Sequence, residues 1–197
     1  MKKMNVRTLT GVAVLTAIVV LLQFVSMNLR FGAFSITLVL LPVVVGAALY
    51  GPWAGGWLGF VFGVVVLLTG DAAAFLAVTV PGTLVTVLLK GTVAGLGAGL
   101  VYRLLEKKNP TVAVVCAALA APVLNTGVFL LCCLAFFMPT LTAWGQAAGM
   151  ENVFVYMMVG LVGINFLIEL GTNMVLAPVA VRLIGLGKDA YQRGRVK

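Results

Sequence analysis

The sequence of 197 residues contains no histidine, three cysteines and only five acidic residues. The cysteines, Cys116, Cys132 and Cys133, lie within apolar stretches and do not form a CxxC motif. Isolated cysteines in apolar surroundings behave as small hydrophobic side chains, and zinc sites need clusters of cysteine or histidine. We therefore expect neither a disulfide framework nor a metal site.

Motifs that carry catalysis or nucleotide binding are also missing. The sequence has no Walker A motif, no GxSxG and no HExxH, and its acidic residues show no DxxxD spacing. A membrane-embedded enzyme acting on lipid-linked or prenyl substrates would need paired carboxylates or a nucleophile with its base. We therefore expect a protein that is not an enzyme, with no catalytic residues and no cofactor, and keep the membrane enzyme as an alternative.

Charge is scarce and hydrophobicity is high. Charged residues make up 9% of the chain and hydrophobic residues 62%, whereas a soluble globular domain carries about 25% charged residues. Because a bilayer core of roughly 30 Å requires about 20 apolar residues per helix, the chain has room for about six crossings. The expected fold is an all-α integral membrane protein, one domain over 1–197 with transmembrane helices at 8–27, 35–49, 54–69, 81–105, 111–137 and 153–184.

The few charges are distributed unevenly along the chain. Thirteen basic residues against five acidic ones give a net charge of +8. Eleven of the basic residues lie toward the two chain ends or in the short segment around position 107. Because cytoplasmic segments of membrane proteins are enriched in Lys and Arg, this distribution predicts an N-in, C-in topology. The basic excess thus indicates orientation in a lipid bilayer and not a nucleic-acid partner.

Two charged residues, Lys90 and Glu169, lie deep within predicted spans, far from the span ends. A charged group near the bilayer centre costs roughly 2.5 to 3.5 kcal/mol on insertion scales, so each needs a partner, a cavity or a function. Lys90 shares one helix face with Thr83 and Thr86, because the three are spaced i, i+3 and i+7. This face predicts a polar track that leads into the membrane.

A second polar face lies on the last predicted helix, where Asn165, Glu169 and Asn173 are spaced four apart, and Asn125 lies at a comparable depth on the fifth. One interpretation is a pocket open to the outer side, in which Lys90 meets an anionic group of a small ligand. The other is a buried ion pair between Lys90 and Glu169 that only fixes helix packing.

Arg30 and Asp71 lie in predicted outer segments. Solvation in a loop explains charges at such positions. Alternatively, the two belong to a lid, and Arg30 guides an anion toward the pocket. The complete set of predicted substrate-binding residues is Lys90, Asn125, Thr86, Asn165, Glu169, Arg30 and Asp71.

Small and aromatic residues follow simpler patterns. Aromatic residues near the outer boundary, such as Phe75 and Trp144, are typical of an interfacial belt. Glycines recur every four residues on two predicted helices, which favours close helix packing over ligand contact. These two glycine stripes are Gly55, Gly59 and Gly63, and Gly91, Gly95 and Gly99.

Five short motifs run through nearly the whole chain. They are Ala13-x-x-x-Ala17, the stretch Ile36 to Pro42, Gly51-Pro52-Trp53-Ala54-Gly55 followed by Gly59, Leu89-Lys90-Gly91 up to Gly95 with Tyr102-Arg103, and Pro122-x-x-Asn125-Thr126-Gly127. In this order, with six predicted spans, they resemble the substrate-binding S component of the energy-coupling factor (ECF) transporters. The resemblance is to the group that includes riboflavin- and pantothenate-type members.

The resemblance implies a six-helix fold with a ligand site near the outer face, in a bacterial cytoplasmic membrane. It implies high-affinity binding of a small water-soluble vitamin or related micronutrient for uptake, with pantothenate and riboflavin as the first ligands to consider. A membrane coupling subunit and two cytoplasmic ATPases would be the partners, and only they would use ATP. The resemblance also implies that Ala13 and Ala17 form the alanine motif through which members of this family dock onto the membrane coupling subunit. Small residues four apart can instead serve packing within one chain. A non-transporting scaffold or morphogenesis subunit and a self-sufficient secondary carrier are the alternatives.

Overall fold

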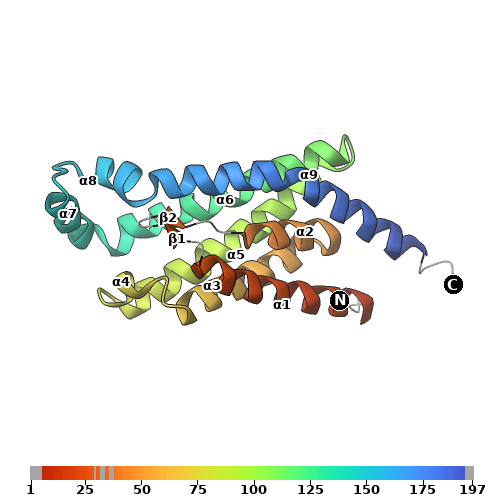
Figure 1. Cartoon of the computed structure of the whole chain (residues 1–197), viewed down its shortest axis with the longest axis horizontal. Helices are drawn as coiled ribbons and strands as arrows, with labels where there is room; N and C mark the ends of the chain where they lie inside the picture. Colours follow the sequence, from red (N-terminus) through yellow and green to blue (C-terminus); the bar gives the residue numbers. More distant parts are fainter. Residues whose placement is uncertain (1–5, 29, 32–33, 36–37, 194–197) are drawn as a thin grey trace.

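The computed structural model describes residues 6–28, 30–31, 34–35 and 38–193, which are almost entirely helical. Most helices run along the long axis of the molecule (Figure 1). The start of α1 and the end of α9 lie toward one end, and α4, α7 and α8 lie at the other. The elements are α1 (Val6–Asn28), β1 (Arg30–Phe31), β2 (Phe34–Ser35), α2 (Leu40–Tyr50), α3 (Pro52–Leu68), α4 (Ala73–Leu76), α5 (Val80–Leu105), α6 (Pro110–Phe136), α7 (Met138–Ala147), α8 (Val153–Val155), the π-helix η1 (Tyr156–Leu161) and α9 (Gly163–Arg193).

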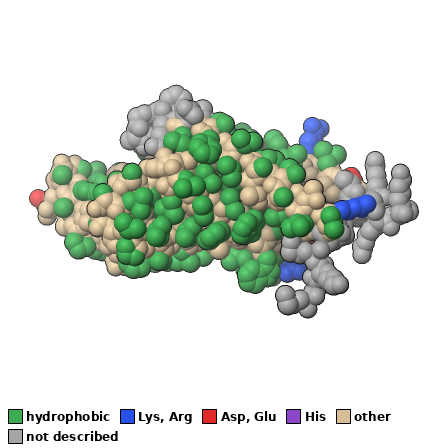
Figure 2. Space-filling model, turned by 90° about the horizontal axis from the view of Figure 1, so that it is seen from below, with side chains coloured by type: hydrophobic (Ala, Val, Ile, Leu, Met, Phe, Trp, Pro, Cys, Tyr) green, Lys and Arg blue, Asp and Glu red, His purple; other side chains and the backbone are tan. Residues whose placement is uncertain are grey.

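Four of the described helices, α1, α5, α6 and α9, are long and apolar enough to cross a membrane. α2 and α3 are apolar but shorter, with 11 and 17 residues, or about 17 and 26 Å at 1.5 Å per residue. Hydrophobic side chains cover the face seen in Figure 2, and Lys and Arg side chains lie near the end where α9 finishes. The chain is therefore a multi-pass membrane protein. The count of six spans and their orientation stay predictions.

α3 and α5 contact each other backbone to backbone through glycine. A Cβ atom at Gly59 would lie 2.0 Å from the carbonyl oxygen of Gly91, and one at Gly95 would lie 2.0 Å from the carbonyl oxygen of Gly55. A side chain at either position would have to push the helices apart, which is why small residues allow such close crossings. The two glycine stripes thus face each other, and Gly91, which directly follows Lys90 in the chain, lies in this contact.

The second helix begins later than the sequence predicts. The expected span 35–49 corresponds to α2, which starts at Leu40, and Ser35 instead pairs with Arg30 in the short hairpin β1–β2. Pro42 therefore falls in the first turn of α2 and not in its interior. Proline is tolerated there because the N–H groups of a first turn have no helical acceptor.

The structure also differs from the expected spans between residues 138 and 163. Residues 138–152, expected as a loop, contain α7, which carries Pro139 in its first turn. The expected span 153–184 is divided into α8, η1 and α9, and α9 continues to Arg193. The division falls beside Gly163, where a Cβ atom would lie 2.7 Å from the carbonyl oxygen of Met158. Glycine permits this close approach, and such π segments often occur at functional sites.

Cysteine labelling tests the predicted orientation. Ala148 follows α7 and Asn109 precedes α6, and both are exposed at opposite ends of the molecule (Figure 1). In a variant whose native cysteines are replaced by alanine, a membrane-impermeant thiol reagent should modify Ala148→Cys in intact cells. Asn109→Cys should react only after permeabilisation, because the basic residues predict a cytoplasmic location. The reverse pattern would contradict the N-in, C-in topology.

Candidate functional site

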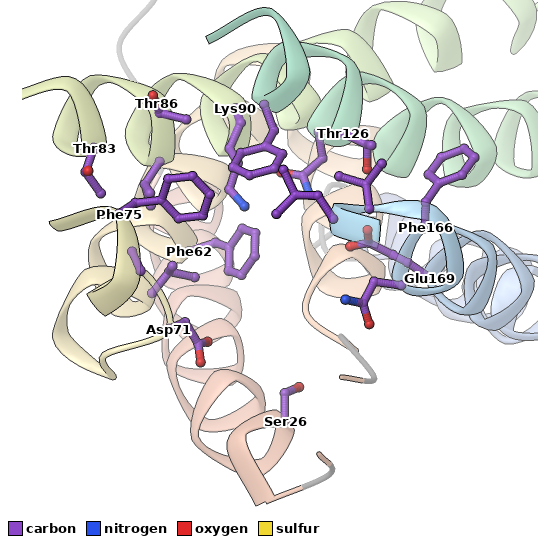
Figure 3. Close-up of a pocket in the computed structure, with 18 of the residues that line it drawn as sticks. Ser26, Phe62, Asp71, Phe75, Thr83, Thr86, Lys90, Thr126, Phe166 and Glu169 are labelled. Carbon is purple, nitrogen blue, oxygen red and sulfur yellow. The ribbon is translucent and has the colours of Figure 1, made fainter. Parts of the chain in front are cut away.

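A cavity of about 270 Å³ lies among α1, α3, α5, α6 and α9 (Figure 3). α4 and η1 contribute Phe75 and Leu161 to its wall. Its lining includes both polar side chains and aromatic rings. A concave site of this size, largely apolar but with a few converging polar groups, is typical of small-molecule binding.

Lys90 and Glu169 lie on facing helices across this cavity (Figure 3). They interact electrostatically but form no direct ion pair. The Lys90 ammonium instead lies 5.1 Å from the centre of the Phe129 ring. The side chain of Asn125 lies near the Glu169 carboxylate. Each charge thus has a neutral neighbour of its own, so the described contacts do not match a simple packing ion pair.

The polar face of α9 is only partly directed to the cavity. Asn165 and Glu169 line it. Asn173, one turn further along, is buried, and its amide nitrogen donates a hydrogen bond of 2.9 Å to the backbone carbonyl of Glu169. Asn173 therefore stabilises the helix beside Glu169 and does not line the cavity.

α1 supplies two cavity residues that sequence reasoning missed. Gln23 and Ser26 are buried and line the cavity. Gln23 donates a hydrogen bond to Asp71 in the turn after α3, and Ser26 accepts one from the backbone N–H of Leu38 at 3.4 Å. The available signal was a polar pair three residues apart on one face of an apolar helix, which predicts burial against polar partners.

The threonines of α5 contribute less than their spacing predicts. Thr83 and Thr86 line the cavity, but their hydroxyl groups donate to the carbonyls of Thr79 and Gly82, each at 2.7 Å. Threonine hydroxyls in helices commonly bond back to the preceding turn in this way. The predicted polar track is therefore largely satisfied by its own helix, and Lys90 is the group on α5 that remains available.

Aromatic rings form one wall of the cavity. Phe75 on α4 makes edge-to-face contacts with Phe129, Phe137 and Trp144, with ring centroids 5.5, 4.9 and 5.5 Å apart. Such contacts stabilise a cluster by more than the area that they bury. Phe75 thus joins α4 to α6 and α7 over the cavity, a position that the interpretation as an interfacial belt did not predict.

Six of the seven predicted substrate-binding residues line this one cavity. They are Lys90, Asn125, Thr86, Asn165, Glu169 and Asp71. The seventh, Arg30, belongs to β1 by its backbone, and its side chain lies outside the part that the structure describes. Contact of these residues with a ligand stays a prediction.

The two predicted docking residues lie elsewhere. Ala13 and Ala17 are exposed on α1, among exposed large apolar side chains such as Val14 and Ile18. Their surface therefore faces away from the core of this chain. Packing within the chain does not account for them, and docking stays a prediction.

Comparisons with known proteins give the family. Residues 7–181 match the family described as ECF transporter, substrate-specific component. No curated protein matches the sequence significantly. A solved structure of ThiT from Listeria monocytogenes is similar, with a TM-score of 0.62 and 21% identity over 91% of this chain and 99% of ThiT, a likeness that concerns the fold alone. Because the family match covers most of the sequence, the chain belongs to the ECF transporter substrate-specific component family.

Proposed function

We propose that the chain is the membrane-embedded subunit that binds a small water-soluble vitamin or related micronutrient for uptake across a bacterial cytoplasmic membrane. The observation that carries this proposal is the cavity in which Lys90 and Glu169 face each other without forming a direct ion pair. Membership of a family of substrate-specific transporter components supports it.

The energetics of burial favour a site over a packing device. Ionisable groups at membrane depth are expensive, and such residues usually mark substrate pathways or sites. A pair kept only for packing gains most when the two charges meet directly with all their hydrogen bonds satisfied. Lys90 and Glu169 keep apart on either side of a cavity of about 270 Å³. A polar ligand between them would supply the partners that they do not give each other.

Partner subunits would supply the energy for transport. The family match supports an ECF membrane coupling subunit and two cytoplasmic ATPases as partners. The exposed stripe of Ala13 and Ala17 on α1 is a surface that another helix can approach closely. Co-purification with these subunits would favour this proposal over a self-sufficient secondary carrier, which would transport in their absence.

Mass spectrometry of the purified protein tests the proposal most directly. Small molecules retained through purification are extracted and identified, and a panel of water-soluble vitamins is then titrated into the emptied protein. We expect one vitamin-like compound to be retained and to bind again. A protein that retains nothing and binds nothing in the panel would be a scaffold and not a binding subunit.

Replacement of Lys90 tests the cavity as the binding site. Lys90→Met keeps the length of the side chain and removes its charge, so affinity for the retained compound should fall about 10- to 100-fold, or about 1.4 to 2.8 kcal/mol. Calorimetric titration measures the loss. Lys188→Met is the matched control, because Lys188 also lies over an aromatic ring, that of Tyr102 at 5.2 Å, but pairs with Glu106 away from the cavity.

The double variant Lys90→Met/Glu169→Gln separates the two interpretations of these charges. Should Lys90 serve only as a partner of Glu169, the single variant would be unstable and the double variant would recover both stability and binding. We expect the double variant to bind weakly, because the ligand contact of Lys90 is still missing. Full affinity in the double variant would remove Lys90 from the site.

A further inference from the structure

The side chains that line the cavity differ in whether they can donate or accept hydrogen bonds. An ammonium group can only donate hydrogen bonds, and a carboxylate can only accept them. Of the described side chains that line the cavity, Lys90 is the one that only donates, whereas Glu169 and Asp71 only accept. The amide and hydroxyl side chains can both donate and accept, so the groups that they leave unbonded decide what a ligand can contact.

Two side-chain amides lie beside these carboxylates. Gln23 donates its amide nitrogen to Asp71, and because a carboxylate cannot donate in return, this bond determines which end of the Gln23 amide is the oxygen. The side chain of Asn125 lies near Glu169. The two amide oxygens, Gln23 Oε1 and Asn125 Oδ1, are buried and receive no hydrogen bond in the described part of the chain. A buried acceptor left without a donor is destabilising, because its lost hydration is not replaced.

The threonine hydroxyl groups of α5 supply no donor to the cavity. Thr83 and Thr86 use their hydrogens on the carbonyls of their own helix, so their oxygens can only accept further bonds. The hydroxyl groups of Ser26 and Thr126 can still donate or accept. Gln23 Oε1 and Asn125 Oδ1 thus remain buried acceptors without a donor among the described residues, and a molecule that brings donors into the cavity can satisfy them.

The ammonium group of Lys90 can donate hydrogen bonds to a ligand. Lys90 makes no hydrogen bond with the described residues and contacts the face of the Phe129 ring. A cation over an aromatic face is attracted to it electrostatically without using its N–H groups. The strongest bonds that those N–H groups can form are charge-assisted bonds to a carboxylate or similar anion.

We propose that the ligand is a small organic acid that also carries several hydrogen-bond donors, such as hydroxyl or amide N–H groups. Its carboxylate binds Lys90, and its donors bind Glu169 and the amide oxygens of Gln23 and Asn125. The inference rests on the proposed function, since it names the chemistry of the molecule that the same site takes up.

Three probes separate the two features of such a ligand. Pantothenate has a carboxylate together with hydroxyl groups and an amide N–H. Panthenol keeps those donors but has an alcohol in place of the carboxylate, and nicotinate keeps a carboxylate on a ring without donors. Each probe is titrated calorimetrically into the purified full chain. We expect pantothenate to bind, and the other two to bind at least about tenfold more weakly, since each lacks one class of contact.

Equal affinity for pantothenate and panthenol, or for pantothenate and nicotinate, would overturn the inference. So would a co-purified molecule that lacks either the carboxylate or the donors, although retention of that molecule would leave the proposed function standing. A co-purified acid rich in donors supports the inference even when pantothenate itself does not bind. Failure to retain or bind any micronutrient would overturn the proposed function, and the inference with it.

Discussion

Gly59→Leu should prevent the chain from forming a stable, monodisperse protein. The new Cβ atom would lie 2.0 Å from the carbonyl oxygen of Gly91, which is part of a helix backbone and cannot move aside as a side chain can. Overpacking a core typically costs 1 to 3 kcal/mol and sometimes more. Because α3 and α5 would have to separate, we expect about 3 kcal/mol or more, a large share of a stability of about 5 to 15 kcal/mol. Size-exclusion chromatography in detergent after heating measures the loss.

A glycine elsewhere in the fold provides the matched control. Gly171 lies within α9, and a Cβ atom there would have no neighbour within 4 Å beyond its own helix. Gly171→Ala should therefore be neutral or stabilise the protein by up to about 1 kcal/mol, through the better helix propensity of alanine. Normal stability of Gly59→Leu would show that α3 and α5 do not meet through their backbones.

The double variant Ala13→Leu/Ala17→Leu should abolish transport and leave ligand binding by the isolated protein nearly unchanged. Both alanines are exposed on α1, so larger side chains there would not disturb the core of the chain. They would instead keep a partner helix from approaching closely. Uptake of labelled ligand by cells that contain the coupling subunits, and titration of the purified variant, measure the two effects.

Another exposed alanine controls for general effects of a larger apolar surface. Ala135 is exposed on α6, and Ala135→Leu should leave both uptake and binding intact. Loss of binding together with uptake in the α1 variant would mean that Ala13 and Ala17 support the fold of this chain. Normal uptake would mean that the partner docks on another surface.

Long apolar runs allowed the main helices to be predicted from the sequence, but the boundaries depended on contacts that it does not show. α5 and α6 lie close to their expected ranges because each has a proline in its first turn. The polar segment 106–109 also separates the end of α5 from the start of α6. The start of α2 was misplaced because a proline inside an apolar run was counted as part of a longer helix. α7 was taken for a loop because it is short. η1 was taken as part of one continuous helix, because a π-helix has no distinct apolar period that would set it apart.

Some cavity residues could likewise be predicted from the sequence, and others could not. Lys90 and Glu169 were predictable because a charge in an apolar span is costly wherever it points. Gln23 was not, because its role depends on Asp71, which is distant in sequence and meets it only in the fold. Thr86 lines the cavity, but its hydroxyl hydrogen is used within α5, a preference that spacing alone does not reveal.

Gly91, which α3 holds at backbone distance, directly follows Lys90 in the chain. The root of the Lys90 side chain is therefore set by main-chain contact and not by neighbouring side chains, which could change rotamer. Helix backbones packed at this density yield little, so the main chain of α5 beside Lys90 should keep its position when a ligand binds. Adjustment to a longer or shorter ligand then falls to the side chains that line the cavity.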